Sequence, residues 1–514
     1  MWSICWSWFV FGAGCKSPSS TPPIPTEVHT ADTGPQPWPT TSWSIPAVER
    51  LRDGVPGMAW SEGNFDVLLL EDCQEVVDQL GHCLGINPLT PFFTFQFEAD
   101  APIGHPVGVF QLGPDEAIVF VGETPPEGVY LGLQNYVYAR DYGSGTHDLV
   151  VATVSPSINQ RNLAYVGDAD SPWGRLTAVV WTANQATGRR IEAELSAAGI
   201  PEAAINIVPI PDLDSTDRAA VTADPDFEGV TVVDLRMGYE PTDDWFTVIV
   251  RMAGIPLDSL YIDPRITPAA AFKVSLDAPE PYEPFPYPKL PPPRDPTGGP
   301  EGLGDALTLL ANTVRDEVLA AGLEHARLRF GTNDFDGYRC LENGTACGSI
   351  DDALYMNSFS TSIPPTSSGG MFAVGIVHPD VPSRYAGAPE LAYSSLTLRN
   401  EPQRMGVVGI WHTELRGTAR ARYPNGIPGI APSDLDLMYV WEFARDCAGR
   451  SACTSIGDGP VEVPAGHDFN LTERAYLDHR TNTGPSAAAI VAPWSIWYGQ
   501  DVRVQLLQQR VRLP

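Results

Sequence analysis

Basic residues are scarce in this sequence. Its 514 residues include 32 Lys and Arg against 63 Asp and Glu, which gives a formal net charge of −31 at pH 7. A protein that binds nucleic acid needs a basic face for the phosphate backbone, so this composition argues against nucleic acid as a partner. The same charge repels anionic lipid surfaces, and membrane association therefore requires a covalent anchor.

Several motifs of catalysis and cofactor binding are missing as well. The sequence has no Gly-x-Ser-x-Gly turn, no His-Glu-x-x-His zinc helix, no Cys-x2-Cys pair and no glycine-rich phosphate loop. The usual signatures of serine hydrolases, zinc sites and nucleotide binding are therefore not present. The sequence does not decide whether the protein is an enzyme.

The apolar segment at the start of the chain is short. It runs from Trp2 to Gly14 and falls well below the roughly 20 residues that a membrane-spanning helix needs. It ends in Gly12-Ala13-Gly14-Cys15, and Ser17 to Trp43 are rich in Pro, Thr and Ser. Such a composition keeps a chain extended and solvated, as a tether requires.

This junction resembles the lipobox of bacterial lipoproteins, in which signal peptidase cuts before the cysteine and lipid is attached to its sulfur. The resemblance implies a signal peptide at 1–14, a lipidated Cys15 and a tether at 15–45. The expected location is extracytoplasmic, anchored to a bacterial membrane at the outer membrane, periplasmic face or cell surface. A plain cleaved secretory signal is the alternative, and it also places the protein outside the cytoplasm.

The cysteines support an oxidising compartment. Apart from Cys5 and Cys15, the remaining six of the eight cysteines fall into three closely spaced pairs. Short spacing suits local disulfides, which persist outside the reducing cytosol. The predicted disulfides are Cys73–Cys83, Cys340–Cys347 and Cys447–Cys453.

Strand-like segments, rich in aromatic and β-branched residues, dominate the rest of the chain. They cover 91–98, 116–122, 129–140, 148–155, 371–378, 391–399, 404–415 and 436–445. One β-α-β unit is predicted over 176–211, with Gly199 and Pro201 ending its helix. We therefore expect an α+β fold, strand-rich, with largely antiparallel sheets and a few helices.

A proline-rich segment divides the chain. Residues 279–300 read PEPYEPFPYPKLPPPRDPTGGP, a composition that favours polyproline II and excludes helix. Its interleaved aromatic residues indicate a strap that lies against a surface. Because 514 residues exceed the usual size of one core, we expect two α+β domains, at 46–278 and 301–514.

From Cys340 onward the chain resembles an uncharacterised group of secreted proteins. The matching elements are RCLENGTAC, GIVH at 375–378, ARDCAGRSAC at 444–453 and RAYLDHRTNTGP at 474–485; SPSIN at 155–159 and TANQATGRRIEAELSAAG belong to the same pattern in the first half. The group has no established reaction, so the resemblance implies a shared fold and no activity.

Two histidines are candidates for acid–base chemistry. His378 ends a predicted strand beside Asp380, and His412 is followed by Glu414 on what the pattern predicts to be the same strand face. If the two strands are neighbours, two imidazoles and two carboxylates converge in a general acid/base or metal site. The alternative is that both histidines are hydrogen-bonded structural residues.

Acidic loops are candidates for weak calcium sites, although most such loops are solvated turns. The first contains Asp212, Asp214 and Asp217, and the second contains Asp334 and Asp336. Calcium is the one cofactor that the sequence suggests. A stacking surface for sugars or peptides is a further possibility at Trp494, Trp497 and Tyr498.

Together these features favour a lipid-anchored extracytoplasmic protein that acts as a surface binding or structural module for an unknown extracellular ligand. An extracytoplasmic hydrolase with a histidine general base is the alternative hypothesis. A calcium-stabilised adhesion protein is the third.

Overall fold

The residues that the computed structural model describes all lie within the compact unit Thr41–Pro514. They are 44–68, 73–80, 83, 87–90, 92–97, 108–167, 171–211, 234–255, 269–285, 300–333, 337–346, 348, 350–360, 369–456, 463 and 467–499. None of the described helices combines the length and the hydropathy that a membrane crossing requires.

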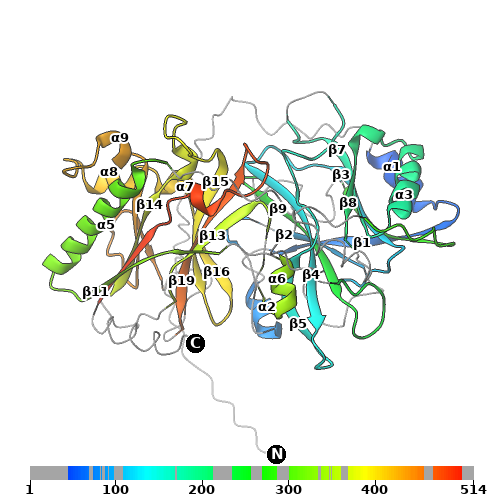
Figure 1. The fold of residues 1–514 in the computed structure, drawn as a ribbon, viewed down its shortest axis with the longest axis horizontal. Helices are drawn as coiled ribbons and strands as arrows, with labels where there is room; N and C mark the ends of the chain where they lie inside the picture. The colour runs from blue at the N-terminus through cyan, green and yellow to red at the C-terminus, as the bar shows by residue number, and fades with distance from the viewer. Residues whose placement is uncertain are drawn as a thin grey trace, which may run out of the picture. The chain divides into compact units, whose positions relative to one another are not determined.

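The first half of the chain forms one large sheet (Figure 1). Its strand order is β5-β4-β9-β2-β1-β10-β3-β7-β8, with β6 paired to β4. The bounds are β1 Met58–Leu68, β2 Phe92–Gln96, β3 Ala117–Glu123, β4 Tyr130–Asp141, β5 His147–Thr153, β6 Ile158–Asn159, β7 Leu176–Thr182, β8 Ile205–Pro209, β9 Trp245–Ala253 and β10 Ala269–Leu276. All of these pairings are antiparallel except that of β7 with β8.

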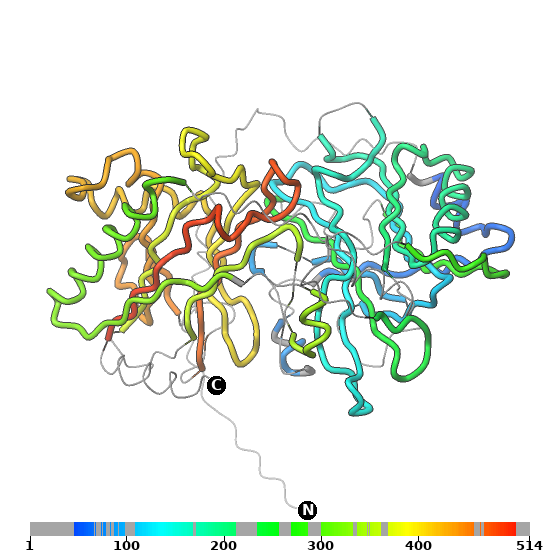
Figure 2. The backbone as a smooth tube through the Cα atoms, viewed as in Figure 1, coloured from blue at the N-terminus to red at the C-terminus, as the bar shows by residue number. Residues whose placement is uncertain are grey.

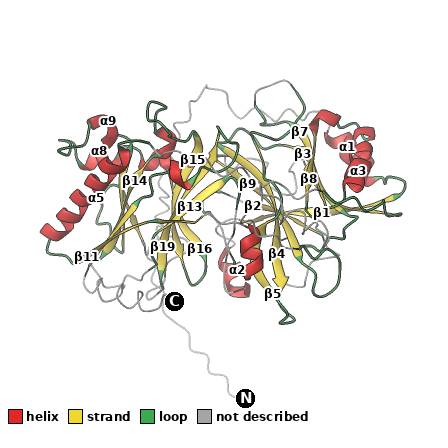
Figure 3. Cartoon of the chain, viewed as in Figure 1, coloured by secondary structure: helices red, strands yellow, loops and turns green. Residues whose placement is uncertain are grey.

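The parallel pair is the predicted β-α-β unit. Helix α3 (Gln185–Ala197) connects β7 to β8 and begins at Asn184, whose side chain accepts the amide hydrogen of Ala186. Gly199 follows the helix with a φ of +103°, a conformation that favours glycine. Helices α1 (Ser44–Arg52) and α3 lie at the β3-β7-β8 end of the sheet (Figure 3). The prediction for this segment is confirmed.

The second half forms two five-stranded sheets. One has the order β11-β20-β14-β17-β18, with bounds His325–Arg329, Trp494–Tyr498, Gly370–Ile376, Met438–Ala444 and Cys453–Ser455. The other has the order β12-β13-β19-β15-β16, with bounds Gly331–Asn333, Ala353–Asn357, Phe469–Asp478, Leu391–Asn400 and Met405–Trp411. In Figure 2 the green β11 runs beside the red β20, so the first and the last strand of this half pair with each other.

Each of these sheets buries a face. Residues from both sheets, including Leu354, Leu396, Ala373 and Phe443, share one apolar cluster. On its other face the β14 sheet packs against helix α5 (Leu303–Ala320) through residues such as Leu310. Other short helices described in this half are η5 (His378–Asp380), α7 (His412–Leu415), α8 (Thr418–Arg422), α9 (Pro432–Leu435) and η6 (Ala487–Ala489).

Elements of each half pack against the other half. Helix α6 (Gly337–Asn343) of the second half packs on β5, where the Tyr338 hydroxyl donates to the Val154 carbonyl at 2.7 Å. A Cβ on Gly337 would lie 2.2 Å from the Thr153 carbonyl oxygen, so only glycine permits this approach. In the other direction, Cys83, which follows α2 (Cys73–Leu80), reaches the turn between β15 and β16, where its amide donates to the Gln403 carbonyl at 2.9 Å.

The α+β prediction is confirmed, including the largely antiparallel sheets.

Within the predicted strap, residues 281–285 lie against the start of α3. Gln185 donates from its amide to the Glu283 carbonyl at 2.8 Å and from its side chain to the Pro284 carbonyl at 2.8 Å. Both halves also contribute side chains to the same apolar clusters. The two-domain boundary at the strap stays a prediction.

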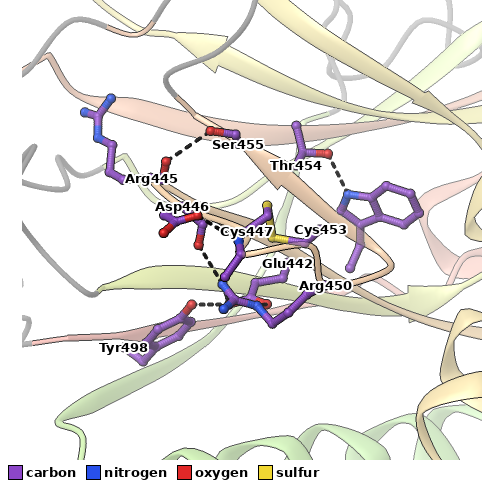
Figure 4. The surroundings of a disulfide bond; sticks show 11 residues. Glu442, Arg445, Asp446, Cys447, Arg450, Cys453, Thr454, Ser455 and Tyr498 are labelled. Carbon is purple, nitrogen blue, oxygen red and sulfur yellow. Dashed lines mark hydrogen bonds and ion pairs between the residues drawn. A yellow bond between two sulfur atoms is a disulfide. The ribbon is translucent and has the colours of Figure 1, made fainter. Parts of the chain in front are cut away.

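Two predicted disulfides are present, Cys73–Cys83 and Cys447–Cys453. Cys340 is also disulfide-bonded, and its predicted partner Cys347 lies outside the described residues. Figure 4 shows how Cys447–Cys453 closes the turn between β17 and β18, where Arg450 bridges to Glu442 at 2.9 Å. Disulfides persist in oxidising compartments, so the chain folds in an extracytoplasmic environment.

We expect no free thiol among the six cysteines from Cys73 to Cys453. Alkylation of the denatured, unreduced protein should add no mass at these positions, whereas prior reduction should make all six reactive. Intact-mass spectrometry followed by peptide mapping measures this. Modification of Cys340 and Cys347 without reduction would contradict the third pair.

Candidate functional site

His378 lies in a packed interior. It is the first residue of η5 and is fully buried, and its Nε2 lies 3.3 Å from the Val491 carbonyl oxygen. Its Nδ1 is buried without a hydrogen-bond partner in the described part of the chain. Burial lowers the pKa of His378 to about 4, and the bond to Val491 opposes this only in part. The imidazole is therefore neutral at pH 7.

His412 and Glu414 do not share a strand face. The predicted strand ends at Trp411, and His412 begins the short helix α7, so the strand prediction for 412–415 is wrong. Glu414 accepts the Trp411 amide hydrogen at 2.9 Å, which caps this helix. Because this cap forms directly after β16, the chain leaves the strand at Trp411 and enters α7.

The structure does bring Asp380 to His412. Asp380 forms an ion pair with Arg416, which follows α7, with Nε and Oδ2 2.5 Å apart. Burial lowers the pKa of His412, while the Asp380 charge and a hydrogen bond to the Ser394 backbone act in the opposite direction. The two predicted histidines thus bond to different carbonyl groups, those of Val491 and Ser394.

The other predicted sites lie outside the described residues. These are the lipidation site Cys15 and the calcium candidates Asp212, Asp214, Asp217, Asp334 and Asp336. Within the part of the chain that the structure describes, no group of three or more His, Cys, Asp or Glu side chains is placed to hold a metal ion.

In the described part of the chain, several buried polar groups gather where the first sheet meets the β13-β19-β15 sheet, and no sequence motif marks them. At their centre is Asp352, 0% exposed and just before β13. Its carboxylate accepts hydrogen bonds from the Tyr130 hydroxyl at 2.8 Å, the Ser157 hydroxyl at 2.7 Å and the Asn159 amide at 2.9 Å. Burial raises the pKa of Asp352, and the three hydrogen bonds oppose that rise.

This arrangement depends on a glycine and on a second loop. A Cβ on Gly132 would lie 2.1 Å from the Tyr130 hydroxyl and 3.0 Å from the Asp352 carboxylate. Asn159 also donates to the Asn482 carbonyl at 3.0 Å, and Asn482 has a φ of +59°. SPSIN and RAYLDHRTNTGP, two elements of the sequence resemblance, therefore meet at Asn159, which is itself a donor to Asp352.

Tyrosine rings fill the space beside Asp352. The Tyr130 ring centroid lies 5.0 Å from that of Tyr476, and Tyr476 stacks on Tyr393 at 4.5 Å. The Tyr393 hydroxyl lies 3.3 Å from the Thr90 hydroxyl. Burial raises the pKa of Tyr355, Tyr393 and Tyr130, so each hydroxyl keeps its proton.

Two arginines complete this polar junction. Arg251 on β9 is 4% exposed, donates to the Tyr136 hydroxyl at 2.5 Å and lies 4.9 Å from the Phe92 ring centroid. Arg474 on β19 is 3% exposed and donates to the Thr397 hydroxyl at 2.6 Å. We use the name polar junction for Asp352, Tyr130, Tyr136, Arg251, Tyr355, Tyr393, Arg474 and Tyr476.

Comparisons with known proteins identify no activity. No family model matches the chain, and neither does any curated protein. Among solved structures, an uncharacterized protein from Burkholderia cenocepacia is similar over 88% of this chain and 86% of its own, with 12% identity and a TM-score of 0.38. The VPA0106 protein from Vibrio parahaemolyticus is similar over 83% of this chain and 96% of its own, with 10% identity and a TM-score of 0.33.

We expect His378 to make the protein less stable in acid. Its folded pKa of about 4 lies below the ordinary value of 6.5, so between these values the unfolded state binds a proton that the folded state does not. Stability is then lost as pH falls from about 6.5 to about 4, by at most about 1.4 kcal/mol per pH unit. Urea unfolding of wild type and His378→Gln across this range should show a shallower loss in the variant; equal slopes would refute the expectation.

Proposed function

We propose that this protein is a lipid-anchored extracytoplasmic binding module. The observation that supports binding is the polar junction, where charged and hydroxyl groups from both halves are gathered in the protein interior. Natural interiors bury such groups sparingly because each needs a compensating partner. A site for a ligand is one reason to maintain so many of them at one place.

The geometry favours binding over hydrolysis. His378 is enclosed, neutral at pH 7 and bonded to a backbone carbonyl. The Asp380 charge acts on His412 and raises its pKa, but the Asp380 carboxylate also forms an ion pair with Arg416. A histidine hydrolase is therefore the second candidate, and its support is the proximity of His412 and Asp380.

The location rests on two features of different kinds. The disulfides require an oxidising compartment, and the sequence before the folded unit resembles a lipobox followed by a proline-rich tether. A single acyl chain anchors weakly, whereas the multiple chains of a bacterial lipoprotein cysteine hold a protein at a membrane. A tether of this composition keeps an acidic body away from the lipid surface.

We expect Cys15→Ser to abolish lipid attachment and to release the protein from the membrane fraction. The measurement is metabolic labelling with a fatty acid, followed by fractionation of the cells. The matched control is Cys5→Ser, which changes a cysteine within the predicted signal peptide and should leave labelling intact. Membrane retention of the Cys15→Ser protein, with its label, would exclude the anchor.

A further inference from the structure

The polar junction carries more positive charge than its described partners neutralise. A guanidinium stays ionised in a protein, and burying an ion costs several kcal/mol unless other groups compensate. In the described part of the chain, neither Arg251 nor Arg474 lies within ion-pair distance of a carboxylate. The buried carboxylate of Asp352 accepts three hydrogen bonds, and the Arg251 charge acts to lower its pKa, so Asp352 offsets Arg251 and leaves Arg474 without a counter-charge among the described residues.

A row of side chains crosses the second sheet at Arg474. In the register of β13, β19 and β15, Tyr355 and Ser395 stand directly opposite Arg474 on its two sides. Residues opposite each other in an antiparallel pair project from the same face of the sheet. Tyr355, Arg474 and Ser395 therefore project from one face of the sheet, and the Tyr355 hydroxyl is engaged by Tyr476.

Ser395 is a second, independent indication that a ligand binds at this place. Its side chain is 0% exposed, and its Oγ has no hydrogen-bond partner in the described part of the chain. A buried hydroxyl without a partner costs about 1–3 kcal/mol, so such groups mark strain, a bound water or a bound ion. Here the unpartnered hydroxyl stands opposite Arg474, which has no counter-ion among the described residues.

The first sheet supplies a second cation to the same place. Arg251 stands opposite Gly132 of β4, whose Cβ position lies 3.0 Å from the Asp352 carboxylate, and the charges of Arg251 and Arg474 both act to lower the pKa of Tyr355. The Arg474 guanidinium lies 5.5 Å from the Tyr355 ring centroid. The described hydrogen bonds use one N–H of each guanidinium, and each group has several more.

We propose that Arg474 and Ser395, together with Arg251, bind an oxyanion, the carboxylate or phosphate group of a ligand. Planar guanidinium groups match the geometry of both anions, and the Ser395 hydroxyl can donate a further hydrogen bond. This inference rests on the proposed binding function and names the chemistry of its ligand.

The first test uses inorganic phosphate and acetate as probes, with chloride at equal ionic strength as the reference. The melting temperature of the purified full-length protein should rise saturably with one oxyanion, because a ligand that binds the native state stabilises it. A larger response to phosphate indicates a phosphate group, and a larger response to acetate indicates a carboxylate. No saturable response to either would overturn the proposal.

Substitutions then locate the site. Arg474→Gln should weaken oxyanion binding by about 10- to 100-fold, the loss expected for a hydrogen bond to a charged group. Arg189→Gln removes the same charge from an exposed position, with 58% of its side chain accessible, and should leave affinity unchanged. An equal loss in both variants would mean a general charge effect and would exclude the site.

Ser395→Ala separates binding from structure, and it keeps the proposal testable if Arg474→Gln fails to fold. It should raise the melting temperature of the anion-free protein, because it removes an unpartnered hydroxyl, and at the same time weaken anion binding. A soak of wild-type crystals with selenate should place an anomalous peak within hydrogen-bond distance of Arg474 and Ser395. Peaks confined to the surface would overturn the site. Such a result would not affect the proposed location, which lipid labelling at Cys15 tests separately.

Discussion

The carboxylate of Asp352 is the group on which the arrangement of the two halves depends. It is buried, it precedes β13 of the second half, and all of its described donors come from the first half. Removing one partner of a buried, hydrogen-bonded charge leaves the other uncompensated at a cost of several kcal/mol. Asp352 therefore fixes how β4 and β6 meet the β13 sheet.

Several other features become understandable from that contact. Gly132 has no side chain because the Tyr130 hydroxyl and Asp352 occupy its space. Arg251, on the strand that pairs with β4 at Gly132, is carried into the same interior. The packing that joins the halves thus places a cation beside the tyrosines of β13, β15 and β19, where the proposed oxyanion site lies.

Local features of the fold were predictable from the sequence. The alternation of aromatic and β-branched residues located β4 within a residue at each end, and Gly199 and Pro201 marked the end of α3. Close cysteine spacing predicted two disulfides that are present. Each of these signals lies within about a dozen residues, where spacing and turn chemistry determine the outcome.

Long-range features were not predictable in this way. Strand β1 pairs with β10, more than 200 residues away, because apolar faces match in three dimensions. The end of β16 depended on a cap made by Glu414, so His412 and Glu414 were placed on a strand that does not extend to them. Asp352 follows Asp351 in a stretch without any motif, and only its partners from distant strands distinguish it.

The most direct test of this account is calorimetric unfolding of Asp352→Asn beside the exposed control Asp148→Asn. An asparagine amide must turn an N–H toward one of the three donors, which leaves a buried group unpaired and should cost about 1–3 kcal/mol. The account predicts a single transition that moves as a whole to lower temperature, with the control unchanged. A second transition whose temperature is the same in the variant and in wild type, or an unaltered melting temperature, would contradict the central role of Asp352.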